Sequence, residues 1–232
     1  MIEFLIGFGI LVAYFIICAS TALILRKTVK INDELFRKIL HFILLTSLFV
    51  FVFAFKTWWI SGITCLLVIA IAYPILFACE RFKTFSNTFN ERKKGEIRLS
   101  LIIVFTMFLV IISICWGLLN DKILCLVAIF SWGYGDAMAA LVGTKYGKHK
   151  IYKKKSAEGT LAMFITSFVV VLTILLIHNK IPFYGSIATA FIVAMASALT
   201  ELYTPNGFDT ITCPFASLLV LLPMLSLFGG LL

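Results

Sequence analysis

Residues 123–143 read ILCLVAIFSWGYGDAMAALVG, an apolar run that carries a single charged residue, Asp136. A helix that spans a bilayer needs about 20 mostly apolar residues. A charged side chain in the hydrocarbon region costs roughly 2.5–3.5 kcal/mol on insertion scales, so it usually has a partner or a function. The stretch therefore predicts a transmembrane helix that carries a functional acid.

The rest of the chain repeats this apolar pattern. Of its 232 residues 62% are hydrophobic and only 13% are charged, far from the balance of a soluble domain. The apolar windows cover residues 4–25, 39–55, 57–79, 99–120, 123–143, 159–177, 181–200 and 210–232. We predict an all-α, polytopic membrane protein, with residues 1–232 forming a single integral membrane domain of eight helices in one bundle. Because window 39–55 is short, seven helices and a re-entrant segment are the alternative. Residues 4–25 are expected to stay as a span, since no basic residue precedes them to mark a cleavable leader.

The basic residues predict the topology. All but three of the 20 Lys and Arg side chains lie in segments 26–38, 80–98 and 144–158, which are alternate connections between the windows. The positive-inside rule makes that side cytoplasmic and leaves both termini outside. The net charge of +9 then needs no nucleic-acid partner. Oligomeric state is left open by the sequence.

Asp136 is followed by small residues and then by a basic segment. Small residues such as Gly135 and Gly143 let a neighbouring helix or a ligand approach closely. A carboxylate in such a place suits Mg²⁺, which prefers one or two carboxylates together with water and phosphate oxygens. The alternative is an aspartate that pairs with a lysine for packing only.

The basic segment leads into the sixth window. Helix N-termini attract phosphate, and the lysines would add charge to such a site. Ser156 is expected to cap this helix. Glu158 lies in the first turn, where it would help to cap the helix, bind a metal ion or act as a general base. The candidate phosphate-binding residues of this segment are Lys145, Lys148, Lys155, Ser156, Gly159 and Thr160. His149 and His178 are expected to have no specific role.

Two further segments on the predicted cytoplasmic side contain candidate catalytic or ligand-binding residues. Arg37, Lys38 and His41 stand at the start of the second window, where Arg37 and His41 share a helix face. Residues 201–209 hold Glu201 and Asp209 in a loop without a basic residue, which suits metal ligands or a general base. The alternative to a functional role is that His41 only packs in the fold and that Glu201 and Asp209 are ordinary exposed loop residues.

Together these pieces resemble the CTP-dependent lipid alcohol kinases, the family of dolichol kinase, phytol and farnesol kinase and yeast-type diacylglycerol kinase. The resemblance rests on four elements and a weaker basic segment, Lys93-Lys-Gly-Glu-Ile-Arg98. They are Arg37-Lys-x-x-His41, Gly135-Asp136-x-x-Ala-x-x-x-Gly143-x-x-x-Gly147, Lys155-Ser156-x-Glu158-Gly159-Thr160, and Glu201 with the later Asp209. Thr210 departs from the family, which usually has asparagine there, so no role is expected of it.

The resemblance implies transfer of the γ-phosphate of CTP, with a divalent cation such as Mg²⁺, to a membrane isoprenoid alcohol or to diacylglycerol. Asp136, with Glu201 or Asp209, would hold the metal, and the basic residues named above would hold the phosphates. Glu158, Asp209 or His41 would accept the proton of the alcohol. The catalytic face is predicted to be cytoplasmic and built from residues 35–41, 93–98, 133–160 and 201–210.

Two other functions are alternatives. Phosphatidate cytidylyltransferase is distantly similar to the same family, also uses CTP, and makes CDP-diacylglycerol. An ion-coupled transporter would also place acids within spans. A transporter is expected to show charged residues near mid-bilayer and paired repeats. Here the outer halves of the windows are nearly free of ionisable groups, and the sequence shows no internal repeat.

Overall fold

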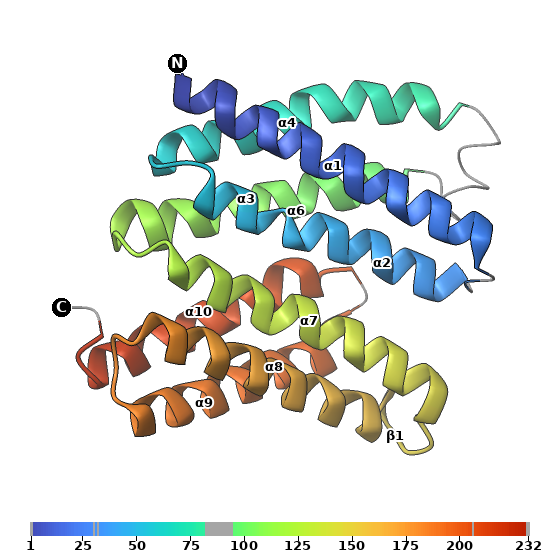
Figure 1. Ribbon diagram of the computed structural model, residues 1–232. Helices are drawn as coiled ribbons and strands as arrows, with labels where there is room; N and C mark the ends of the chain where they lie inside the picture. The colour runs from blue at the N-terminus through green and yellow to red at the C-terminus, as the bar shows by residue number, and fades with distance from the viewer. Residues whose placement is uncertain (1, 30, 32, 82–94, 206, 231–232) are drawn as a thin grey trace. The chain divides into compact units, whose positions relative to one another are not determined.

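The computed structural model describes residues 2–29, 31, 33–81, 95–205 and 207–230. Within them eight helices are long and apolar enough to cross a membrane, which confirms the all-α, multi-pass prediction (Figure 1). The contacts divide the chain into two compact units, residues 1–120 and 121–232. The prediction of one membrane domain with a cytoplasmic face stays a prediction.

Unit 1 contains the first four of these spans. Its elements are α1 (Ile2–Thr28), α2 (Asp33–Thr46), α3 (Leu48–Phe53), α4 (Trp58–Cys79), α6 (Glu96–Ile112) and the π-helix η1 (Ser113–Leu118) that continues α6. Phe51, Phe105 and Phe108 are fully buried and stack edge to face or tilted at its centre. Such aromatic pairs add stability beyond their buried area.

The short second window forms an interrupted helix. The break falls at Ser47, between α2 and α3, where the Ser47 hydroxyl donates a hydrogen bond to the Leu44 carbonyl over 2.6 Å. Residues 35–53 together are nevertheless long and apolar enough to span a bilayer. The structure therefore favours eight spans over seven and a re-entrant segment.

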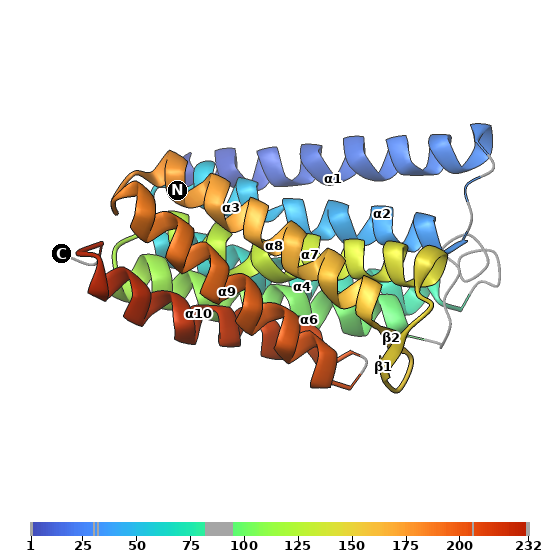
Figure 2. The same ribbon diagram turned by 90° about the horizontal axis from the view of Figure 1, so that it is seen from below.

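Unit 2 contains the other four spans. Its elements are α7 (Ile123–Tyr146), the strands β1 (Lys150–Tyr152) and β2 (Lys155–Ser156), α8 (Ala157–His178), α9 (Phe183–Tyr203) and α10 (Asp209–Leu227). Helix α7 is the most buried span of the chain and packs against α8, α9 and α10 (Figures 1 and 2). The charged residue of the opening stretch thus lies on the central helix of this unit.

The two strands were not predicted. The sequence indicated only a basic connection between the fifth and sixth windows, but β1 and β2 pair antiparallel as a short hairpin. Figures 1 and 2 place this hairpin and the α9–α10 connection at the same end of the unit 2 helices, which we call the hairpin end. The lysines of this segment are therefore held on a folded element.

The small residues of α7 bring α8 close, as expected. A Cβ atom added to Gly159 of α8 would lie 3.0 Å from the Ala139 carbonyl oxygen and 3.4 Å from the Gly143 Cα. One added to Gly135 would lie 2.5 Å from the Ser167 hydroxyl. These glycines therefore serve helix packing, since larger side chains would push α7 and α8 apart.

A second polar cluster lies at the opposite end of unit 2. Asp121, 6% exposed, accepts hydrogen bonds from His178 at 3.0 Å and from Lys180 at 2.9 Å. The expectation that His178 has no specific role is therefore wrong. Burial alone would raise the pKa of Asp121, but the hydrogen bonds and charges of His178 and Lys180 outweigh it, so that the pKa lies below its ordinary value.

Asp121→Asn is expected to lower the melting temperature of the detergent-solubilised protein at neutral pH. Removing one partner of a buried pair leaves the other unsatisfied, a cost of about 1–3 kcal/mol. Because the folded-state pKa of Asp121 is depressed, its stabilisation is present above pH ~4 and is lost as the pH falls through the folded pKa. The difference in melting temperature between wild type and variant is therefore expected to vanish in acid.

The control for this experiment is Asp33→Asn, which removes an exposed ion pair with Arg26. Exposed pairs contribute only about 0–1 kcal/mol. Equal melting temperatures for Asp121→Asn and wild type at pH 7 would contradict a stabilising role of this cluster.

Candidate functional site

Three acidic residues that the sequence singled out meet at the hairpin end of unit 2. Asp136 lies on α7, Glu201 in the last turn of α9, and Asp209 is the first residue of α10. The negative charge of Asp136 acts on both Glu201 and Asp209, which places the three carboxylates within electrostatic reach of one another. The sequence predicts this grouping, because the segments that carry these acids lie on one predicted side of the membrane.

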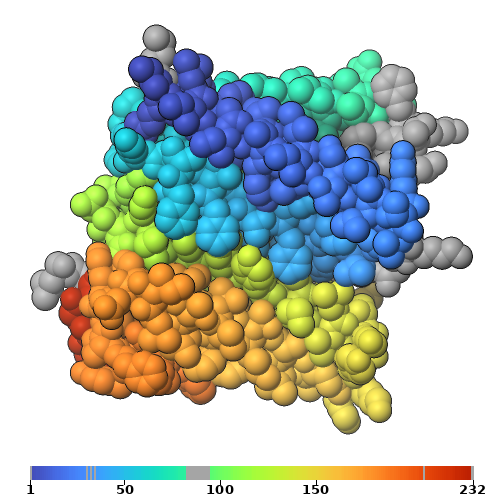
Figure 3. Space-filling model, viewed as in Figure 1, coloured from blue at the N-terminus to red at the C-terminus, as the bar shows by residue number. Residues whose placement is uncertain are grey.

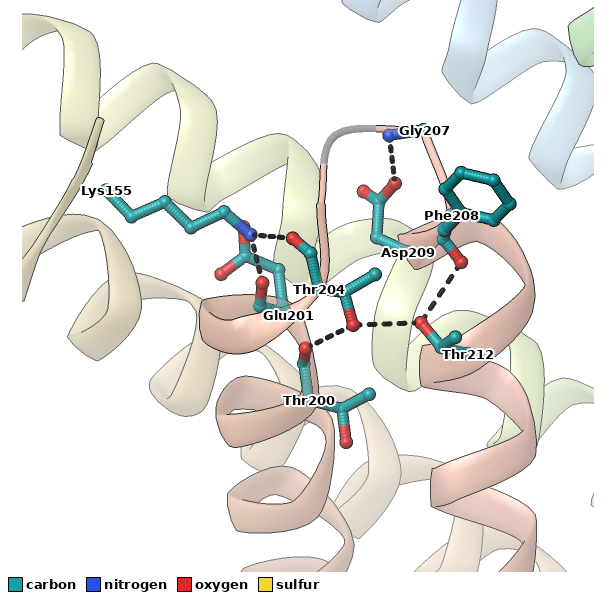
Figure 4. A network of polar contacts seen from close by, with 8 residues as sticks. All are labelled: Lys155, Thr200, Glu201, Thr204, Gly207, Phe208, Asp209 and Thr212. Carbon is teal, nitrogen blue, oxygen red and sulfur yellow. Dashed lines mark hydrogen bonds and ion pairs between the residues drawn. The ribbon is translucent and has the colours of Figure 1, made fainter. Parts of the chain in front are cut away.

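Lys155 delivers a positive charge to this cluster from strand β2. Its Nζ lies 2.8 Å from Oε1 of Glu201, and both side chains are largely buried. Figure 4 shows the lysine reaching across to the end of α9, with Asp209 on the neighbouring helix. A buried carboxylate is strongly disfavoured without such a partner, so this ion pair compensates part of the charge of the cluster.

The same lysine also caps α9. Its ammonium donates to the carbonyl oxygens of Glu201 and, over 3.2 Å, of Thr204. The last carbonyls of a helix have no partner within the helix and carry partial negative charge. Lys155, which the sequence predicted to bind phosphate, is thus hydrogen-bonded to the end of α9. A bound phosphate would contact an ammonium group that α9 already holds in place.

The start of α8 confirms one prediction and corrects another. Ser156 caps the helix, since its hydroxyl accepts a hydrogen bond of 3.2 Å from the Gly159 N–H. Glu158 lies 2.7 Å from Nδ1 of His149 and accepts from the His149 backbone N–H. His149, expected to have no role, therefore partners one of the candidate catalytic acids. Its position nine residues before Glu158 follows no helical spacing, so no sequence signal pointed to the contact.

Thr160 differs from the other threonines at this end. Its hydroxyl is buried and has no hydrogen-bond partner among the residues that the structure describes. The hydroxyls of Thr144 and Thr204, in contrast, donate to carbonyls four residues earlier. A buried hydroxyl without a partner is costly, so Thr160 is a position at which a bound group would be stabilised.

The remaining lysines of the segment are exposed. Lys145 and Lys148 point to the surface, and the Lys145 ammonium lies 5.1 Å from the ring centroid of Tyr146. In the space-filling view the segment that contains the hairpin projects from the lower edge of unit 2 (Figure 3). Long, exposed lysine side chains of this kind are able to reach an anion that approaches from solvent.

The first basic motif lies in unit 1. Arg37 forms an ion pair of 3.7 Å with Glu96, and Lys38 and His41 are half-buried nearby on α2. Sequence reasoning did not assign Glu96, although it belongs to the basic segment 93–98, of which Lys93 and Lys94 lie outside the described residues. That residues 35–41 and 93–98 join the unit 2 cluster in one catalytic face stays a prediction.

The acids of unit 2 fit a magnesium ion by their chemistry. Within the described ranges no three His, Cys, Asp or Glu side chains form a group that would hold a metal ion by themselves. Mg²⁺ does not require one, because it usually binds one or two carboxylates, several waters and substrate phosphates. Asp136, Glu201 and Asp209 carry carboxylate oxygens of the kind that such a site would use.

Comparison with known proteins found two relatives. The chain is 35% identical over 106 residues to a phytol kinase from Synechocystis sp., a match that covers 44% of this chain and 45% of that protein. It is 26% identical over 230 residues to a probable chloroplastic phytol kinase from Triticum aestivum, which covers 90% of this chain and 72% of that protein. No family model matches the chain, and no solved structure does.

The matched region thus spans less than half of the cyanobacterial relative and nearly three quarters of the wheat relative. The wheat match extends over almost the whole of this chain, both units included. These similarities support a relationship to the kinases of lipid alcohols.

Proposed function

We propose that this protein is a membrane-embedded kinase that transfers the γ-phosphate of a nucleoside triphosphate, CTP, to an isoprenoid alcohol of the phytol type. The observation that carries the proposal is the meeting of Asp136, Glu201 and Asp209 with Lys155 at the end where α8 and α10 begin. The similarity to two proteins named as phytol kinases supports the same function.

Asp136 and Glu201 are the proposed magnesium ligands. Lys155 engages Oε1 of Glu201 and so fixes the position of this carboxylate. When bound, the ion would neutralise charge on the phosphate oxygens, which is the main requirement of phosphoryl transfer. The protein side chains then have to hold the two substrates in line.

The phosphates are proposed to lie against the N-terminus of α8. Thr160 would donate a hydrogen bond there, the positive end of the helix dipole would favour the anion, and Lys145 and Lys148 would approach from the surface. Lys155 would act mainly by fixing Glu201 and the end of α9. Arg37 and Lys38 keep the phosphate-binding role that the family resemblance implies.

Asp209 is the proposed base for the alcohol. Of the three candidates, Glu158 is paired with His149, and His41 belongs to unit 1, whereas Asp209 lies in unit 2 with the other acids. Asp209 is less buried than Glu201 and accepts a hydrogen bond of 3.1 Å from the Gly207 N–H, which orients its carboxylate. A carboxylate at the edge of the site is suited to take the hydroxyl proton.

A labelled-nucleotide assay tests the reaction. Purified protein in lipid nanodiscs with phytol and Mg²⁺ is expected to move ³²P from γ-labelled CTP onto the lipid, and none from α-labelled CTP. A lipid product that carries the α-label would instead identify a cytidylyltransferase. Labelled ATP, GTP and UTP run in parallel determine the nucleotide preference.

Asp136→Asn and Asp209→Asn are expected to fail in different ways. A lost metal ligand raises the Mg²⁺ concentration needed for half-maximal rate, whereas a lost base lowers kcat by about 10²–10⁴-fold at an unchanged Mg²⁺ dependence. Initial rates over a Mg²⁺ titration measure both. The control is Asp33→Asn, an exposed acid outside the proposed site. Near-wild-type turnover in both site variants would exclude this assignment.

Lys155→Met is expected to lower both stability and turnover, because it leaves Glu201 buried without its cation; breaking a buried pair costs about 3–5 kcal/mol. The double variant Lys155→Met/Glu201→Gln is expected to regain most of the melting temperature but not the turnover. Lys154→Met, the exposed neighbour in the hairpin, is the matched control and is expected to behave as wild type. Recovery of turnover in the double variant would contradict a role of Glu201 in metal binding.

A further inference from the structure

An open groove runs between α9 and α10 beside the acidic cluster. Its cavity volume is about 540 Å³, within the range of roughly 300–1,000 Å³ that is usual for small-molecule sites. It is lined by Leu199, Thr200, Tyr203, Thr204, Pro205, Phe208 and Thr212. Most of these side chains present carbon atoms, so the groove suits a hydrocarbon chain.

The groove is lined by the sequence neighbours of two proposed catalytic-site residues. Thr200 precedes Glu201 on α9, and Phe208 precedes Asp209, the first residue of α10. Tyr203 also contacts the hairpin, its ring centroid 5.6 Å from that of Tyr152. The groove thus lies close to the hairpin and to the helix ends that carry Glu201 and Asp209.

Two hydroxyl groups lie where the groove meets the acids. The Thr204 and Thr212 oxygens are 3.1 Å apart, and each also lies within hydrogen-bond distance of a backbone carbonyl, that of Thr200 and that of Phe208 (Figure 4). A threonine hydroxyl that turned away from its backbone carbonyl would donate a hydrogen bond to the oxygen of an incoming alcohol, which leaves the alcohol's own hydrogen for Asp209. The pair would orient an alcohol with its chain in the groove.

The apolar residues that line the groove are exposed. Phe208 is 65% exposed, Tyr203 63% and Leu199 45%. A hydrocarbon chain laid between them would cover this apolar surface, and aromatic rings at such a position hold one chain from both sides.

We propose that this groove holds the chain segment next to the hydroxyl of the acceptor, and that it selects a single-chain isoprenoid alcohol over diacylglycerol. The inference rests on the proposed function and assigns its lipid subsite. One groove of this size takes one chain, whereas diacylglycerol carries two chains on adjacent carbons and would leave the second without a place. Leu199, Tyr203 and Phe208 are then residues that determine specificity.

Leu199→Trp tests the proposal by filling the groove. With phytol as acceptor and γ-labelled CTP as donor, its KM for phytol is expected to rise about tenfold or more, since hydrophobic pockets discriminate by 10–200-fold per changed methylene. Its KM for CTP and its melting temperature are expected to stay as in wild type. Leu219→Trp makes the same change at a 73% exposed position of α10 outside the groove, and is expected to leave all three values unchanged.

Photo-cross-linking supplies a readout that needs no turnover. A phytol analogue with a diazirine on the chain near the hydroxyl is expected to label peptides that contain residues 199–212, in competition with unlabelled phytol. Loss of the label in Leu199→Trp and its retention in Leu219→Trp are the supporting results. Label located mainly elsewhere, an unchanged KM for phytol in Leu199→Trp, or equal phosphorylation of dioleoylglycerol and phytol would overturn the proposal.

The two proposals fail separately. Wild-type protein that phosphorylates phytol but is labelled outside residues 199–212 retains the proposed function and loses the groove. Protein that transfers no phosphate from any nucleotide, but is labelled competitively in the groove, loses the proposed reaction and retains a lipid-binding groove.

Discussion

The ion pair between Lys155 and Glu201 is the interaction on which the organisation of unit 2 depends. Three carboxylates from different helices lie within reach of one another at one end of the unit, and their charges repel. Without a buried cation, the helix ends that carry them would be driven apart or toward water. The hairpin places that cation, because β2 directs Lys155 to the end of α9. A short two-stranded element in an otherwise helical protein thus has a clear structural purpose.

Helix direction at this end also favours an anionic substrate. Both α8 and α10 begin there, and each contributes the partial positive charge of a helix N-terminus. Asp209 lies in the first turn of α10 and Glu158 in that of α8, where acids are favoured by the dipole. Close packing of α7 on α8 through Gly159 brings Asp136 toward the same two helix starts. The acids are thereby stabilised at a place that also attracts phosphate and a divalent cation.

The sequence predicted the helices and the candidate acids better than it predicted which side chains pair with those acids. Eight apolar windows mark eight spans because length and hydropathy are properties of local sequence. The convergence of Asp136 with Glu201 and Asp209 followed from placing the loops on one side. The pairs Lys155–Glu201, His149–Glu158 and Asp121–His178 were missed. Each depends on the exact approach of two elements, or on a hairpin that no apolar periodicity indicates, so local patterns contain no signal for them.

Placing the lipid groove and the acids on the same two helix ends couples acceptor selection to chemistry. Glu201 is fixed by Lys155 on α9, and the hydroxyls of Thr204 and Thr212 join α9 to α10 at the mouth of the groove. A shift of α10 relative to α9 would therefore alter the groove width and move Asp209 in the same step. On the proposed function, a lipid that fits the groove poorly would displace the carboxylate that takes its proton. Specificity would then appear in turnover as well as in binding, as expected where binding energy is used to position the reacting groups.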